Sequence, residues 1–190
     1  MINPIFEDQL FKGIDYTLQP FPNGEYEQCT FINCNFSGVN LFNITFMDCE
    51  FENCNFSEAQ LNNTGLKSVI FKNCKLIGLQ FDRCNPFLLA MGFDNCQLNL
   101  SYFYKLKLKQ TRFKNCNLQE ADFTEADFTE SIFDNCDLAN AIFSKTVLVK
   151  ADFRSSFNYS IDPESNRIKK AKFSRQGLSG LLDKYQIEIE

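Results

Sequence analysis

The chain has 190 residues and a net charge of −5, which fits one domain with one sizeable core. An acidic chain lacks the clustered Lys and Arg that general binding to nucleic acid requires. Its 22 Phe predict a uniform aromatic interior, and the absence of His removes the commonest general base and metal ligand.

Residues 1–25 precede the regular pattern, and we expect them to form an N-terminal cap. Their start, MINPIFEDQLFKG, has acidic residues and no long apolar run, unlike a signal peptide. The longest apolar patch, PFLLAMGF, is much shorter than a membrane span. We therefore expect a cytoplasmic protein, whose nine Cys stay free in a reducing compartment.

A repeat of five residues begins at Tyr26. Every fifth residue from Tyr26 to Phe81, and again from Phe93 to Phe153, is Phe or Leu, apart from Tyr26 itself. A mostly small residue lies two positions before each of them. Neither the helical period of 3.6 nor the strand period of 2.0 keeps such a pattern on one face, so the chain must turn at every repeat. Four sides of five residues make a square coil, and stacked coils make a solenoid.

The segment ADFTEADFTE, residues 121–130, contains two tandem copies close to the motif A(D/N)LXX. Over about residues 26–153 the pattern resembles the pentapeptide-repeat family. The resemblance implies an all-β solenoid, a right-handed quadrilateral β-helix over residues 26–158, in which the large and the small residue of each repeat point inward.

A second, longer period appears in the motif of FKNCNL, residues 113–118, whose copies are four repeats apart with one exception. Four repeats are one coil, so the copies lie above one another as a structural ladder. We expect each Asn at a corner, where it accepts a positive φ or bonds to the next Asn, and each Cys inside as a small apolar residue. Parallel thiols do not converge on a metal ion, and their geometry does not suit a disulfide. The ladder residues are Asn33, Asn53, Asn73, Asn95, Asn115, Asn135, Cys34, Cys54, Cys74, Cys96, Cys116 and Cys136.

The interval from Asn73 to Asn95 is longer than the other intervals of the ladder by two positions. This difference predicts a two-residue bulge within residues 84–92. Its apolar residues are Pro86, Phe87, Leu88 and Leu89. At least one of them should face outward and form a contact site, although packing over a corner is equally possible.

Residues 119–137 form an acidic band without a basic residue. We expect its carboxylates to form a partner-binding acidic face: Glu120, Asp122, Glu125, Asp127, Glu130, Asp134 and Asp137. A basic band precedes it with Lys105, Lys107, Lys109, Arg112 and Lys114. Such bands could also pair between coils and serve solubility alone.

Residues 159–190 leave the repeat after one last partial turn. The spacing i, i+3, i+4, i+7 predicts a short helix with an apolar stripe formed by Leu178, Leu181, Leu182 and Tyr185. This stripe either caps the hydrophobic end of the solenoid or forms a homodimer with a second copy.

A rod of this length that ends in a short helix resembles the quinolone-resistance (Qnr) group of the family. The resemblance implies a C-terminal dimer and an acidic rod that imitates DNA, binds DNA gyrase or another topoisomerase and protects it from quinolones. The basic band and the small size of the bulge depart from that group.

The sequence thus predicts a protein that is not an enzyme, has no cofactor or metal site, and binds a protein partner rather than nucleic acid or membrane. The alternative partner site is the bulge, with Phe87 as the anchor of a scaffold or regulator that binds an unrelated protein.

Overall fold

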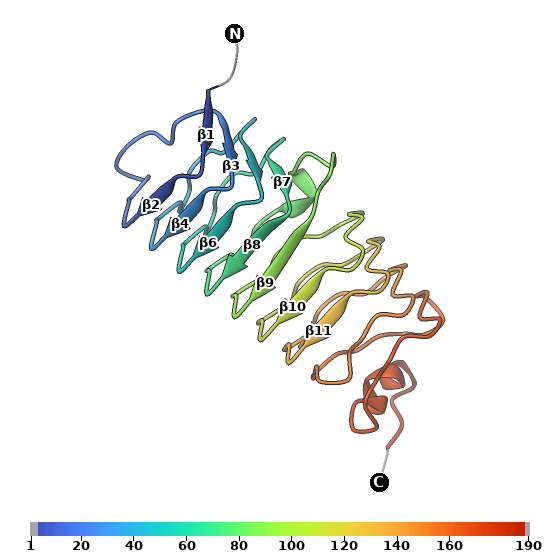
Figure 1. Ribbon diagram of the computed structural model, residues 1–190. Helices are drawn as coiled ribbons and strands as arrows, with labels where there is room; N and C mark the ends of the chain where they lie inside the picture. The colour runs from blue at the N-terminus through green and yellow to red at the C-terminus, as the bar shows by residue number, and fades with distance from the viewer. Residues whose placement is uncertain (1–3, 189–190) are drawn as a thin grey trace.

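The computed structural model describes residues 4–188 as a rod of stacked four-sided coils (Figure 1). Two sides carry regular parallel sheets. Side 1 contains β1 (Ile5–Glu7), β3 (Glu25–Glu27), β5 (Thr45–Met47) and β7 (Gly65–Lys67). Side 2 contains β2 (Leu10–Lys12), β4 (Thr30–Ile32), β6 (Glu50–Glu52), β8 (Val69–Lys72), β9 (Met91–Asp94), β10 (Arg112–Lys114) and β11 (Ile132–Asp134). The expected all-β solenoid is confirmed.

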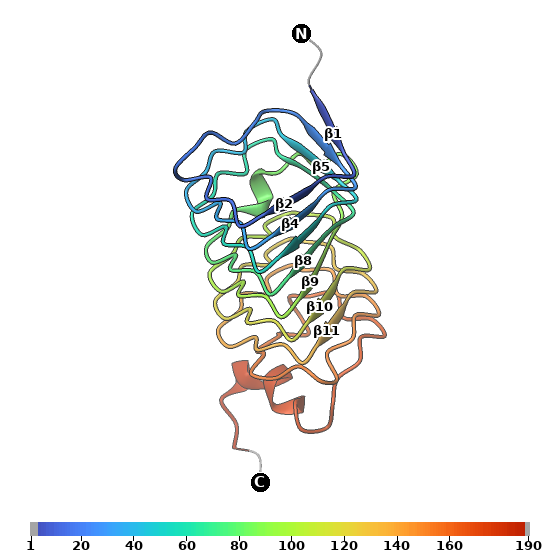
Figure 2. The same cartoon turned by 60° about the vertical axis from the view of Figure 1, so that its left-hand side comes forward.

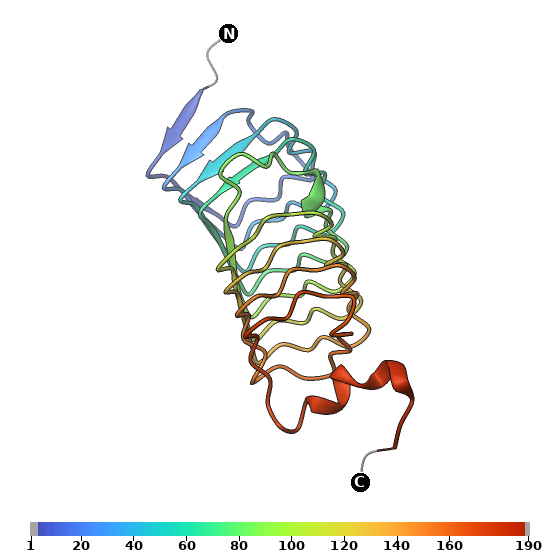
Figure 3. The ribbon, with the colours of Figure 1, turned by 90° about the vertical axis from the view of Figure 1, so that its right-hand side faces the viewer.

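Sides 3 and 4 follow side 2 along each coil and are joined by single bridges instead of strands (Figure 3). Asn35 pairs with Asn55 on side 3, and Asp122 pairs with Ile142 on side 4. One short 3-10 helix, η1 (Phe81–Arg83), lies on side 4. Each coil therefore wraps four short sides of backbone around one central core.

The register between coils is four whole repeats except at one place. Phe31 pairs with Phe51, whereas Phe71 pairs with Phe93. The expected slip of two residues is thus present. It lies on side 1, in the coil that comes after the coil of β7.

A column of aromatic rings runs through the interior behind side 2. Successive rings lie 4.5 to 5.6 Å apart between centroids and are tilted by only 6° to 13°. This spacing is close to the separation of neighbouring strands, about 4.8 Å, so stacked rings and backbone hydrogen bonds fit one geometry. The column consists of Phe11, Phe31, Phe51, Phe71, Phe93, Phe113, Phe133, Phe153 and Phe173.

The thiols and hydroxyls at the small inward position of the repeat also donate hydrogen bonds to backbone carbonyl oxygens. The Cys54 thiol donates to the carbonyl oxygen of Phe31, 23 residues earlier, at 3.4 Å. The hydroxyl of Thr146 makes the equivalent bond to Phe123 at 2.9 Å. All nine Cys are buried and free, and burial raises the pKa of the Cys49 thiol to about 12. The cysteines therefore fill space, as expected, and also link neighbouring coils.

The corners require left-handed backbone, and the Asn ladder supplies it. All six Asn of the ladder have φ between 52° and 54°. Asn tolerates this conformation better than most residues. Side-chain hydrogen bonds join Asn95 to Asn73 at 2.7 Å and Asn135 to Asn115 at 2.9 Å. Both expected roles of these Asn are present.

The two ends differ from expectation. Residues 5–12 belong to the regular coils, because β1 and β2 pair with β3 and β4 in the same register as the later strands. The C-terminal segment forms two 3-10 helices, η2 (Leu178–Leu181) and η3 (Asp183–Tyr185), instead of one helix of two turns (Figure 2). So short a segment, interrupted by Gly180, cannot sustain an α-helix by itself. Within residues 4–188, no helix is long and apolar enough to cross a membrane.

The Cys74 thiol donates to the Phe51 carbonyl oxygen at 3.3 Å. This bond leads to a prediction for substitutions at position 74. Cys74→Ser keeps a small donor and should lower the free energy of unfolding by less than about 1 kcal/mol. Cys74→Leu should cost about 1–3 kcal/mol by overpacking. Urea unfolding measures both values. Equal losses would contradict this account of position 74 as a site for a small hydrogen-bond donor.

Candidate partner-binding surfaces

The seven carboxylates of the acidic band encircle one coil and do not form one face. Asp127, Asp134, Asp137 and Asp122 lie on sides 1, 2, 3 and 4, and the three Glu lie at or beside the corners between them. We call this set the acidic ring. Because its members point in four directions, a flat partner surface cannot contact them all. The expected single acidic face is therefore corrected to a ring.

Cations on neighbouring coils neutralise much of the acidic ring. Lys109 lies 3.5 Å from Asp127, and Lys105 lies 3.6 Å from Glu125. Arg112 pairs with Asp134 at 3.6 Å.

Lys150 pairs with Glu130 and holds the pKa of that carboxyl below its usual range. Each exposed pair contributes little stability, typically about 0–1 kcal/mol. Together they lower the local charge, so the basic band and the acidic ring form one paired zone.

A different acidic surface lies at the N-terminal end, and the sequence analysis missed it. Up to Gln60 the chain contains nine Asp and Glu but only one cation, Lys12, whereas the rest of the chain contains 15 Asp and Glu and 18 Lys and Arg. A count of charges by segment would have shown this asymmetry. Sides 1 and 2 of the first three coils carry the N-terminal acidic surface: Glu7, Asp8, Glu25, Glu27, Asp48, Glu50 and Glu52.

On side 1 the strand carboxylates belong to the first two coils and have no cation between them, while Met47 follows Glu27 in the third coil. Glu7 and Glu27 are direct neighbours in the register of β1 and β3. Like charges on facing positions of neighbouring strands are destabilising. Within residues 4–188, the ion pair that reaches this surface joins Lys72 to Glu50 at 2.7 Å. The N-terminal acidic surface therefore keeps a charge that the acidic ring has lost.

The bulge projects two apolar side chains from side 1. Phe87 is 65% exposed and Leu88 is 64% exposed, whereas Leu89 packs against the core. Leu88 has φ of 56°, a strained conformation for a residue with a branched side chain. The amide of Ala90 returns to the ladder by donating to the Leu66 carbonyl oxygen at 2.9 Å.

A shallow groove of about 430 Å³ lies beside the bulge on side 1. Met47, Lys67 and Leu88 contribute to its walls. The Lys67 ammonium lies 5.6 Å from the centre of the Phe87 ring, a cation–π distance. The bulge thus offers an apolar contact with a cationic edge.

The C-terminal segment closes the far end of the rod. The amide of Ile161 donates to the Gly180 carbonyl oxygen at 2.8 Å and ties η2 to the last coil. Leu181 packs against the core, while Leu178 and Tyr185 remain about half exposed, at 48% and 52%. Leu182 is partly buried. The expected stripe therefore splits, with Leu181 in the cap and two side chains on the surface.

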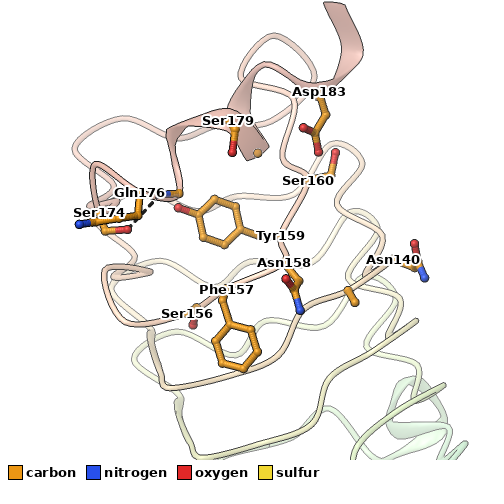
Figure 4. A pocket seen from close by; sticks show the side chains of 13 residues that line it. Asn140, Ser156, Phe157, Asn158, Tyr159, Ser160, Ser174, Gln176, Ser179 and Asp183 are labelled. Carbon is orange, nitrogen blue, oxygen red and sulfur yellow. Dashed lines mark hydrogen bonds between the residues drawn. The ribbon is translucent and has the colours of Figure 1, made fainter. Parts of the chain in front are cut away.

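A polar cleft of about 630 Å³ separates the last coil from η2 and η3 (Figure 4). Serine hydroxyls and amide groups surround it, and Asp183 supplies the one carboxylate of the lining. Tyr159 forms its floor and is almost fully buried, which raises the pKa of its hydroxyl. The lining offers hydrogen bonds but no paired acid and base. Among residues 4–188, no group of three or more Cys, Asp or Glu is arranged to hold a metal ion.

Comparison with protein-family models identifies a pentapeptide repeat region, matched at residues 21–87, 44–123 and 88–181. A comparison with curated protein sequences finds no relative of this chain.

Solved structures of similar shape include a trypsin-treated variant of QnrB1, a plasmid-mediated fluoroquinolone resistance protein. It has a TM-score of 0.72 at 16% identity, covering 100% of this chain and 92% of that one. Full-length QnrB1 has a TM-score of 0.55 at 19% identity, covering 97% and 100%. HetL from the cyanobacterium Nostoc, involved in heterocyst differentiation regulation, has a TM-score of 0.49 at 14% identity, covering 88% and 86%. At these identities the likeness to QnrB1 concerns the fold alone.

The close contact between Gly180 and Tyr159 leads us to predict that a larger residue at position 180 disturbs the C-terminal cap. A Cβ at position 180 would clash with the Tyr159 carbonyl oxygen. We expect Gly180→Ala to displace η2 and η3 at a cost of about 1–3 kcal/mol. Hydrogen exchange should become faster at Ile161 and in residues 174–188 while the β8 and β10 amides stay protected. Unchanged exchange at Ile161 would contradict this account of the cap.

Proposed function

Because the chain belongs to the pentapeptide-repeat family, we propose that it is a non-enzymatic rod that binds a protein partner. The partner surface that fits best is a basic one, of the kind that ordinarily binds DNA. The observation that supports this choice is the N-terminal acidic surface, whose carboxylates lie on three successive coils with one ion pair among them.

The charge density of this surface is close to that of DNA. Coils spaced by about 4.8 Å place its seven carboxylates along roughly 14 Å of rod, or about one charge per 2 Å. Duplex DNA has one charge per about 1.7 Å of its axis. A protein groove lined with Lys and Arg would therefore meet a similar row of charges, and its binding would weaken as salt is added.

DNA gyrase, or another type II topoisomerase, is the candidate partner. QnrB1 is a fluoroquinolone resistance protein, and its fold extends over the full length of this chain. The resemblance to the quinolone-resistance group suggested the same partner. Here we place the contact on the N-terminal acidic surface in preference to the acidic ring, because the ring is paired with cations.

A second candidate function is a scaffold or regulator that binds an unrelated protein through the bulge. It is favoured by the exposure of Phe87 and Leu88 on a protein whose other Phe are mostly buried. Exposed apolar side chains grouped beside a groove are typical of protein contacts.

Supercoiling by DNA gyrase in the presence of a fluoroquinolone tests the first candidate. We expect micromolar wild-type protein to restore supercoiling or, without drug, to inhibit it. The triple variant Glu25→Gln, Glu27→Gln, Asp48→Asn should require at least about tenfold more protein, because three unpaired charges are lost.

The matched control neutralises three members of the acidic ring: Glu120→Gln, Asp122→Asn and Glu130→Gln. It should act like wild type. No effect of the wild-type protein on gyrase would rule out this partner. If Phe87→Ser abolished binding to a captured partner and the N-terminal triple variant did not, the bulge would be the contact site.

We also propose that the protein forms a homodimer through its capped end. Leu178 and Tyr185 are half-exposed on the successive helices η2 and η3, and Ile187, which follows them in the chain, is 55% exposed. Leu181 is not suitable as a dimer probe, because its side chain packs against the core of its own chain.

Leu178→Asp should convert the dimer to a monomer in light scattering, because a charge would enter an apolar contact. Leu18→Asp changes an equally apolar, exposed residue at the other end and should leave the dimer intact. A monomeric wild-type protein would refute the dimer directly.

A further inference from the structure

The N-terminal end of the rod is the edge of two parallel sheets. β1 is the outermost strand of the side 1 sheet, and β2 is the outermost strand of the side 2 sheet. Within residues 4–188, no further strand lies on their outer side (Figure 1). An exposed sheet edge is a template for pairing with another strand.

The backbone of this edge has amide groups whose equivalents in the next three coils donate hydrogen bonds to the preceding coil. Glu25 donates from its amide to the Pro4 carbonyl oxygen, and Thr30 donates to that of Gln9, both at 2.9 Å. The equivalent amides one coil earlier belong to Ile5 and Leu10. No coil precedes these amides in the part of the chain that the structure describes. Since alternate residues of a strand point to the same side, the Glu7 amide also faces this outer edge.

The aromatic interior is incompletely covered at the same edge. Phe6 stacks on Tyr26 and Phe11 stacks on Phe31, each at 4.7 Å, but both rings are only partly buried. Ile5 and Leu10 are each 63% exposed. At the opposite end, Tyr159 and Leu181 cover the last coil and Tyr159 lies 5.6 Å from the Phe173 ring. Phe173 is itself only partly buried, so in the described residues the two ends differ in the closing segment, which η2 and η3 supply at the C-terminal end.

We propose that β1 is a docking edge for an extended peptide segment of a partner protein in which Lys or Arg alternates with apolar residues. The segment adds a strand outside β1, a recognition mode known as β-augmentation. Its apolar side chains continue the ring stack above Phe6, and its cations lie beside Glu7. Its backbone satisfies the amides of Ile5 and Glu7.

Charge selects this occupant over a second copy of the chain. Glu7, Asp8 and Glu25 surround β1, and Lys12, the cation of the first coil, lies on β2 instead. Pairing of two β1 edges would bring these carboxylates together, which is unfavourable. A basic segment gains the same backbone bonds with attraction in place of repulsion.

A labelled peptide tests the proposal with the full-length protein. The probe is fluorescein-labelled Lys-Phe-Lys-Val-Lys-Phe-Lys-Val, and the control peptide has Glu in place of Lys. We expect the Lys peptide to bind at least about tenfold more tightly. At saturation, hydrogen exchange of the Ile5 and Glu7 amides should slow by a similar factor, while exchange in β4 and β6 stays unchanged.

Two variants separate edge pairing from general attraction to the acidic surface. Ile5→Pro removes an outward amide that bonds to nothing in residues 4–188, so the fold should survive and peptide affinity should fall at least about tenfold. Glu7→Lys should weaken binding similarly. Its matched control, Glu120→Lys on the acidic ring, should not.

Wild-type affinity in Ile5→Pro, or peptide binding without slower exchange at Ile5 and Glu7, would overturn the proposal, as would the absence of peptide binding. The inference goes beyond the proposed gyrase contact. The peptide assay contains no topoisomerase, so failure of peptide docking and failure of the proposed gyrase contact are distinguished from each other.

Discussion

Main-chain hydrogen bonds between coils hold the rod together, and they impose one constraint on every other part of it. Because successive coils are offset by four whole repeats, each side chain lies directly above the one in the equivalent position of the previous coil, as Phe31 does with Phe51. Any residue type that recurs at this interval becomes a column. The interior uses this repetition favourably, since stacked Phe rings and thiol-to-carbonyl bonds both fit the strand separation.

On the outside the same constraint decides whether charges cancel or accumulate. Where basic and acidic coils alternate, as with Lys109 and Asp127, neighbours one coil apart pair. Where acidic residues recur at the interval, as with Glu7 and Glu27, the charges add along the rod. A ring of seven carboxylates on one coil and a surface of seven on three coils have the same number of acidic groups, yet they differ in what they present to a partner.

The register relaxes at the bulge and stops at the two ends, and these are the places where apolar side chains reach the surface. The two-residue slip leaves Phe87 and Leu88 outside while Leu89 restores the core. The C-terminal segment packs Leu181 against the core at one end, whereas the outer edge of β1 keeps backbone groups without a preceding coil in the described chain. The exposed groups differ at each of these interruptions of the register. The proposed contacts lie at the interruptions or on the N-terminal acidic surface.

The sequence by itself determined the fold, the coil length, the slip between Asn73 and Asn95, and the inward residues, because a strict short period leaves few alternatives for the backbone. It also predicted Asn at left-handed corners and Cys in the interior. That residues 5–12 continue the coils was also contained in the sequence, because Phe6, Phe11, Tyr16 and Phe21 extend the five-residue period back from Tyr26, although the prediction started the repeat at Tyr26. Only the tertiary structure decided that the band at 119–137 is a paired ring, that Leu181 turns inward while Leu178 stays outside, and which end of the rod has an uncovered edge. Pairing and exposure depend on neighbours one coil away and on how the chain ends close, and neither is contained in a linear run of charges or a helical spacing.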